Sequence, residues 1–214
     1  MHATICNMII DLVHNSIEAG ATEITLKIEE KDSNLSVVIE DNGRGMNAET
    51  LTKAMDPFYT DGQKHKHRKV GLGLAFLYQT VEMTHGTVAI RSQEGEGTTV
   101  RFNLDPSHID LPEFGNFAQA AVAMISHGFE GDLTIEHSVN KKSYTANKAE
   151  LIEVLGDLSE MESLILLKQF IEENEKDILD CEAIFPVIHP EIRNQQSTIG
   201  NFNERWAIYG KNDT

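Results

Sequence analysis

Hydrophobic and polar residues alternate in two stretches near the N-terminus, EITLKIE (23–29) and LSVVIE (35–40). A period of two is typical of half-buried strands, and the polar turn EKDSN between the stretches predicts an antiparallel pair. Residues 2–18 repeat apolar side chains at helical spacing instead, which predicts a helix with one apolar stripe. Gly20 suits the C-terminal end of that helix. The stripe consists of Ile5, Ile9, Leu12, Val13 and Ile17.

The next elements extend this pattern to residue 104. Residues 47–55 predict a short helix capped by Asn47. A long polar loop, DPFYTDGQKHKHRK, then leads to the helical stretch GLGLAFLYQTVEMTHG. Strands at 87–92 and 98–104 complete a four-stranded, mostly antiparallel sheet. With about three helices, the expected fold class is α+β, a two-layer α/β sandwich.

Composition shifts after Asp105, where Pro106 and Pro112 break the pattern. Residues 113–127 predict a helix, DLTIEHSV and KSYTANK predict a hairpin, and two further helices follow. This α-β-β-α-α order predicts a smaller second α/β domain with a core of its own. The expected organisation is therefore a domain at 1–105, a second domain at 106–181 and an irregular tail at 182–214.

Composition and charge exclude several classes of protein. The hydrophobic fraction is 40% and no run approaches the ~20 apolar residues of a membrane span, so we expect no membrane insertion. The N-terminus lacks signal-peptide features, and Cys6 and Cys181 are far apart, which together predict buried thiols in a reducing cytoplasm. A net charge of −16 argues against nucleic-acid binding. The basic run 64–69, KHKHRK, is a local exception that suits an anionic ligand.

The motif DNGRGM (41–46) carries the first candidate chemistry. Asp41 continues the inward row of Leu35, Val37 and Ile39, and a buried carboxylate requires a strong partner. Gly43 and Gly45 let a flat ligand lie against bare backbone. An inward acid followed by two glycines predicts a slot for a planar base with an exocyclic amine. The alternative is a polar Asn-Gly turn at the end of a strand.

Two further features suit a triphosphate. Asp11 and Asn15 are four residues apart and therefore stack on one side of the first helix, where they form either a cation site or a solvated helix edge. Gly71 and Gly73 precede a helix whose first N–H groups are free to face an anion. The basic run 64–69 would supply positive charge above that anion.

In this order, the motifs resemble those of the GHKL ATPases, which share the Bergerat fold and include gyrase-type topoisomerases, heat-shock chaperones, histidine kinases and mismatch-repair ATPases. The resemblance covers residues 4–104. DPFYT and GLGLAFLYQTVEMTHGTV are most similar to the histidine-kinase catalytic domain, whereas LVHNSIEAGAT is more similar to the mismatch-repair type. The motifs that carry the resemblance are DLVHNSIEAGAT, DNGRGM, DPFYTDG with KVGLGL, and GEGTTVRFNL.

The resemblance implies ATP and Mg²⁺ as ligands and a role for each matching residue. Asp41 would accept a hydrogen bond from the adenine amine, Asn15 would coordinate Mg²⁺, and Asp11 would position or deprotonate the attacking group. Thr99 would add a hydroxyl near Asp41. Asp11 is one carbon shorter than the Glu usual in these ATPases, which predicts either slow turnover or a differently placed nucleophile. The remaining expected ligand-binding residues are Gly43, Gly45, Met46, Lys69, Gly71, Leu72, Gly73 and Leu74.

Three functions follow from this resemblance. Only ten residues precede Asp11, so we expect no phosphoacceptor segment of its own, and the first function is phosphoryl transfer to a separate protein. The second is ATP hydrolysis that drives a conformational or dimerisation cycle. The third is nucleotide binding that gates a protein interaction without catalysis. The expected partner is a protein, bound through the acidic C-terminal region, in the cytoplasm.

Overall fold

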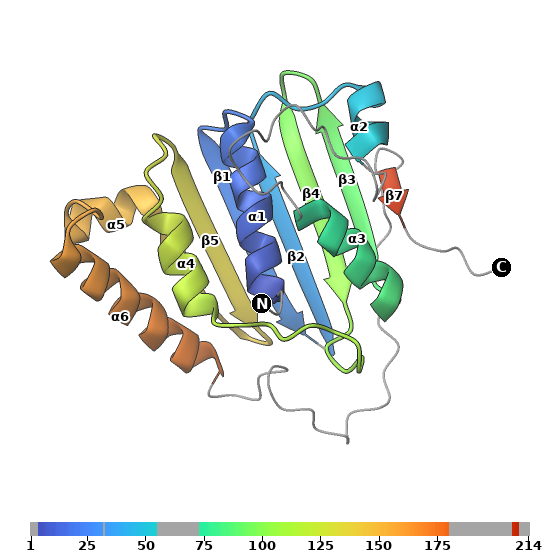
Figure 1. The fold of residues 1–214 in the computed structure, drawn as a ribbon. Coiled ribbons are helices and arrows are strands. Elements are labelled where there is room, and N and C mark those ends of the chain that lie inside the picture. The colour runs from blue at the N-terminus through green and yellow to red at the C-terminus, as the bar shows by residue number, and fades with distance from the viewer. Residues whose placement is uncertain (1–3, 32, 55–72, 180–206, 210–214) are drawn as a thin grey trace.

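The computed structural model describes residues 4–31, 33–54, 73–179 and 207–209. Their strands form one sheet in the order β6-β5-β1-β2-β4-β3-β7, and α1, α3 and α4 lie over one face of it (Figure 1). The helices are α1 (Ile5–Glu18), α2 (Ala48–Ala54), α3 (Gly73–Thr84), α4 (Phe117–Ile125), α5 (Lys148–Leu155) and α6 (Met161–Leu179). The strands are β1 (Glu23–Lys31), β2 (Asn34–Asp41), β3 (Thr87–Gln93), β4 (Gly97–Leu104), β5 (Asp132–Val139), β6 (Lys142–Asn147) and β7 (Ala207–Tyr209).

Helix α1 packs its apolar stripe into the core, as predicted. Four of the five stripe residues are buried and Ile17 is half-buried. Thr4 caps the N-terminus by accepting a hydrogen bond from the Asn7 N–H at 3.2 Å. At the other end Gly20 has a φ of +77°, and the N–H groups of Gly20 and Ala21 donate to the carbonyls of Ile17 and Ser16. This is the Schellman pattern that a glycine after a helix favours.

The central sheet confirms the predicted antiparallel pairs. β1 pairs with β2, β2 with β4, and β4 with β3. On β2 the side chains of Leu35, Val37, Ile39 and Asp41 are all buried, because alternate residues of a strand face the helix layer. The predicted cap of α2 is also present, since Asn47 Oδ1 accepts from the Thr50 N–H at 2.9 Å.

The expected count of four strands is wrong, because the chain after residue 104 extends the same sheet. β5 pairs in parallel with β1, and β6 forms the predicted hairpin with β5. The edge strand β7 pairs with β3. The α+β class and the α/β sandwich are confirmed.

The hydrophobic core is continuous across the expected boundary at residue 105. Buried residues of α1, β1, β5, α4 and α6 belong to one cluster. The backbone also links the two parts, since the N–H groups of Ile5 and Cys6 donate to the carbonyls of Glu113 and Phe114. These bonds satisfy two of the free donors at the start of α1. The structure therefore differs from the expectation of a separate core for residues 106–181, whereas the boundaries at 105 and 181 stay predictions.

A polar cluster formed by residues of β1, β5, β6 and α6 is buried within this core. His137 on β5 contacts Glu175 Oε1 through Nδ1 at 2.8 Å and Glu30 Oε1 through Nε2 at 3.2 Å. Tyr144 on β6 donates its hydroxyl to Glu175 Oε1 at 2.6 Å. Burial by itself would lower the pKa of His137, but the hydrogen bonds and charges of Glu175 and Glu30 outweigh it and raise the pKa from 6.5 to about 9. His137 is therefore a buried cation at neutral pH.

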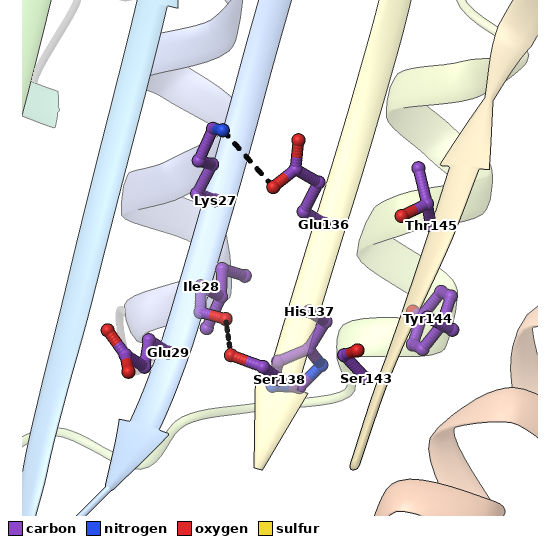
Figure 2. Close-up of a pocket in the computed structure, with 9 residues that line it drawn as sticks. All are labelled: Lys27, Ile28, Glu29, Glu136, His137, Ser138, Ser143, Tyr144 and Thr145. Carbon is purple, nitrogen blue, oxygen red and sulfur yellow. Dashed lines mark hydrogen bonds and ion pairs between the residues drawn. The ribbon is translucent and has the colours of Figure 1, made fainter. Parts of the chain in front are cut away.

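The opposite face of the sheet is polar where it is described. Figure 2 shows a pocket on this face, with Lys27 paired to Glu136 at 3.2 Å and Ser138 Oγ donating to the Ile28 carbonyl at 3.3 Å. None of the predicted site residues lines this pocket. Among the described helices, none has both the length and the apolar character needed to cross a membrane.

Candidate nucleotide-binding site

Asp41 ends β2 with its carboxylate buried on the helix-covered face. Ser16 of α1 donates its hydroxyl to Asp41 Oδ2 at 2.7 Å. Asp41 Oδ1 accepts from the Gly43 N–H at 2.9 Å and from the Thr98 N–H at 3.3 Å. The strong partner that a buried carboxylate requires is thus a set of three neutral donors.

This donor set leaves room for one more hydrogen bond. An ionised carboxylate has about four acceptor positions, and the described residues fill three of them at Asp41. The remaining position is on Oδ2, for which Ser16 is the one donor among the described residues. An exocyclic amine of a nucleobase is a donor of the right kind for this position.

The two glycines after Asp41 occupy positions that no other residue fits. A Cβ on Gly43 would lie 2.9 Å from Asp41 Oδ1 and 2.9 Å from Ala19 Cβ. Gly45 has a φ of +61°, and a Cβ there would lie 1.9 Å from the Gln93 carbonyl oxygen. The bare backbone therefore lets β2, the end of α1 and the β3–β4 turn approach one another closely beside Asp41.

Asn42 and Arg44 fix this loop against the end of α1. Asn42 Oδ1 accepts from the N–H groups of Thr22 and Glu23 at 2.8 and 3.0 Å. Arg44 donates from its guanidinium to the Glu18 carbonyl at 2.8 Å. The loop is therefore held by backbone and side-chain bonds that do not use Asp41.

Met46 and the facing strand complete the described part of the site. The Met46 N–H donates to Ser92 Oγ at 2.8 Å, and its half-buried side chain packs against the core. The expectation that Thr99 lies near Asp41 is wrong. Thr98 is the cross-strand neighbour of Asp41, whereas Thr99 pairs with Glu40 and so faces the opposite side of the sheet.

Asp11 lies directly beside the start of α3. A Cβ placed on Gly73 would be 2.7 Å from Asp11 Cβ, so the glycine allows α3 to begin against α1. Burial raises the pKa of Asp11, and the positive charge of His14 opposes that rise. Asn15 is half-buried one turn further along α1. The structure thus brings Asp11 to the helix N-terminus that sequence reasoning assigned to phosphate.

Several predicted residues lie outside the described part of the chain. These are Lys69, Gly71 and Leu72, together with the rest of the basic run 64–69. Leu74, in the first turn of α3, is described and packs partly buried against the core.

Ser16 and Thr98 are site residues that the sequence reasoning did not single out. Ser16 follows Leu12 by one helical turn and is therefore a polar residue on the buried side of α1, which is the signal that could have identified it. Thr98 lies on the same row as the buried Val100 and Phe102, so the alternation along β4 also indicated that it faces Asp41.

Residues 2–108 match the family model described as histidine kinase-, DNA gyrase B-, and HSP90-like ATPase, and the chain belongs to this family. The match includes every described residue of the site. The chain therefore carries the ATP-binding, kinase-like module of that family.

Several similar curated proteins are named as kinases. Sporulation kinase B of Bacillus subtilis is 34% identical over 107 residues, which cover 49% of this chain and 23% of the kinase. The putative sensor histidine kinase NtrY-like of Rickettsia conorii is 33% identical over 94 residues, which cover 44% of this chain and 15% of that protein. The chain thus matches less than a quarter of the length of either kinase. Among solved structures, the chain is similar to the N-terminal domain of a DNA repair protein, with a TM-score of 0.49 and 13% identity. The match covers 75% of this chain and 58% of that structure's chain.

Proposed function

We propose that this protein binds ATP with Mg²⁺ between Asp41 and the start of α3, and transfers the γ-phosphate to a separate protein. The observation that carries the proposal is the buried Asp41 carboxylate, which neutral donors hold with one acceptor position left over. The adenine amine would fill that position. The glycines at 43 and 45 let the protein backbone close tightly beside Asp41, where the flat base would lie.

The phosphates would lie at the start of α3. The first backbone N–H groups of a helix lack intrahelical partners, and the helix dipole adds to their attraction for anions. Gly73 and Leu74 supply such groups beside Asp11. Asn15 would hold Mg²⁺, a cation that neutralises phosphate charge and takes only one or two protein ligands.

In the transfer, a side chain of the acceptor protein forms a bond to the γ-phosphorus while the bond to the bridging oxygen of ADP breaks. Asp11 would accept the proton of the attacking group, and its raised pKa supports that role. Similarity to sensor kinases supports transfer to a protein. Hydrolysis is a second candidate, because the same carboxylate is equally suited to activate water.

The direct test uses γ-labelled ATP, Mg²⁺, the purified chain and the soluble proteins of the cells from which it comes. Transfer predicts label on a second protein, and no label when Asp41→Asn replaces the wild type. Steady phosphate release without a labelled protein would replace transfer with hydrolysis. ATP binding with neither outcome would leave only a nucleotide-gated interaction.

Asp11→Asn separates binding from chemistry. We expect ATP affinity to stay within about twofold while turnover falls by about 10² or more, which is the usual loss when a general base is removed. Calorimetry gives the affinity, and phosphate release or label transfer gives the rate. Asp110→Asn, which changes an exposed carboxylate elsewhere, is the matched control. A wild-type rate in the Asp11 variant would contradict the assignment of the base.

A further inference from the structure

The corner formed by α5 and α6 lies at the edge of the molecule farthest from α2 and α3 (Figure 1), and exposed apolar side chains are concentrated in these two helices and the turn between them. Seven large apolar side chains are exposed among the described residues, and five of them lie between positions 152 and 166, in α5, α6 and the turn that joins them. Val154 and Met161 are 81% and 73% exposed. We call the five residues the α5–α6 surface; they are Ile152, Val154, Met161, Ile165 and Leu166.

The corner holds these side chains on a fixed backbone. Ser163 Oγ donates to the Leu155 carbonyl at 2.7 Å, which ties the first turn of α6 to the end of α5. The Gly156 N–H donates to the Ile152 carbonyl at 2.9 Å, and Leu158 is buried beneath the turn. Met161 and Ile165 are four residues apart and therefore share one side of α6. Such a preorganised surface loses little entropy when a partner binds.

The surroundings of the α5–α6 surface are acidic. Residues 149–167 contain five carboxylates and no Lys, Arg or His. All five are exposed, and the hydrogen bonds that Asp157 accepts from Ser159 lower its pKa, so it stays ionised at neutral pH. Lys148, which comes just before, is buried and donates to the carbonyls of His127 and Phe129. The five carboxylates are Glu150, Glu153, Asp157, Glu160 and Glu162.

We propose that the α5–α6 surface docks a basic, amphipathic segment of a partner protein, with apolar side chains against exposed residues of α5 and α6 and Lys or Arg facing the carboxylates around them. Large exposed apolar patches with polar rims mark interaction sites. Charge complementarity selects the partner, because opposite charges steer association and like charges oppose it. A second copy fits poorly, since a two-fold contact would bring the same five carboxylates against each other.

The test is the affinity of the full chain for a fluorescent synthetic peptide that repeats Leu and Lys at helical spacing, measured by anisotropy without nucleotide. The same peptide with Glu in place of Lys is the charge control. Because ATP is absent, the result is independent of the proposed nucleotide site. We expect saturable binding of the basic peptide and none of the acidic one.

Matched variants locate the binding site. Val154→Asn and Met161→Gln are each expected to weaken binding by about fivefold or more, as for central residues of an interface. Ile109→Asn and Met83→Gln remove exposed apolar side chains elsewhere, 94% and 43% exposed, and should leave the affinity unchanged. Because all four positions are exposed, all four variants should keep the wild-type melting temperature.

Three results would overturn the proposal. The first is no binding of the basic peptide. The second is wild-type affinity in the Val154 and Met161 variants, or an equal loss in the control variants, because either result would show that binding does not depend on the α5–α6 surface. The third is a wild-type dimer, detected by sedimentation, that Val154→Asn converts to monomer, since the surface would then hold a second copy.

Discussion

Two buried acidic sites lie on the same face of the sheet, at opposite ends of β1 and β2. Asp41 pairs with Ile24 at one end, and Glu30 pairs with Leu35 near the other. Among the described residues Asp41 accepts from neutral donors alone, whereas Glu30 and Glu175 share a buried His137 cation. The comparison contrasts the carboxylate that we propose receives a ligand with two carboxylates whose contacts lie within the core.

The charge balance explains the difference. A buried carboxylate beside a cation is neutralised inside the protein, and removing either partner leaves a costly uncompensated charge. At Asp41 the residues that the structure describes supply hydrogen bonds but no cation, which leaves one acceptor position of the carboxylate open to a further donor. Even so, Glu30 Oε2 is buried without a hydrogen-bond partner in the described part of the chain. Its charge is compensated by His137 through the other oxygen.

The largest expected effect is on the stability of the protein when His137 is replaced. His137→Gln removes the cation between two buried carboxylates, and we expect it to lower the free energy of unfolding by about 3–5 kcal/mol. The measurement is urea denaturation at pH 7. Lys27→Gln breaks the exposed Lys27–Glu136 pair between the same two strands and should cost about 0–1 kcal/mol. Equal effects of the two variants would show that the buried cluster is not ionic.

The pH dependence of stability should follow from the same cluster. The pKa of His137 is raised from 6.5 to about 9, so the folded state binds more protons than the unfolded state between these values. Its contribution is therefore complete below about pH 6.5 and is lost as the pH rises through 9. Burial also raises the pKa of the Cys6 thiol to about 12, which adds to the loss of stability above its ordinary value of 9.

Urea denaturation at several pH values measures this loss. We expect the wild type to lose stability from pH 6.5 to 9, and His137→Gln to lose clearly less over the same interval. Parallel curves for the two proteins would contradict the assignment of the proton to His137.

A smaller effect is expected on ATP binding when a hydrogen bond to Asp41 is removed. Ser16→Ala removes the donor to Asp41 Oδ2, and a hydrogen bond to a charged group contributes about 1.5–3 kcal/mol. The hydrogen bond that the adenine amine would donate to the same carboxylate oxygen offsets part of this loss. We therefore expect the affinity for ATP to fall by a few-fold rather than be abolished. Calorimetric titration with ATP and Mg²⁺ measures the change. Ser126→Ala removes the serine that caps the C-terminus of α4, whose hydroxyl donates to the Val122 carbonyl. It should have no effect, and a loss there as large as at Ser16 would argue against a local cause.

Local pattern predicted most of the fold up to residue 104, because period and capping residues act over a few positions. It also placed Asp41 inward, since Leu35, Val37 and Ile39 set the row. The parallel pairing of β5 with β1 was missed because it joins residues about a hundred positions apart, and no local signal in either strand specifies its neighbour. A helix-hairpin-helix order was therefore assigned a core of its own, although its inward residues complete the core that α1 begins.

Details of the site depend on the register between β2 and β4, that is, on which residue of β4 lies opposite Asp41. The sequence specifies this register less directly than it specifies the strands themselves. Transfer of a family role placed a hydroxyl at Thr99, whereas the alternation through Val100 and Phe102 brings Thr98 to the Asp41 face. A shift of one residue moves a side chain to the other face of a sheet. Ser16 was overlooked because a single serine in an apolar stripe does not reveal what its hydroxyl contacts.

The most direct test of the account compares ATP with inosine triphosphate in calorimetric titrations of the wild type and of Asp41→Asn. Inosine has a carbonyl where adenine has its amine, so it cannot donate to Asp41. We predict that the wild type binds ATP at least about tenfold more tightly than inosine triphosphate, because a site built for a donor rejects an analogue that lacks it. The same preference should disappear in Asp41→Asn. Equal wild-type affinities, or a preference that survives the substitution, would contradict the assignment of Asp41 as the base-recognising residue.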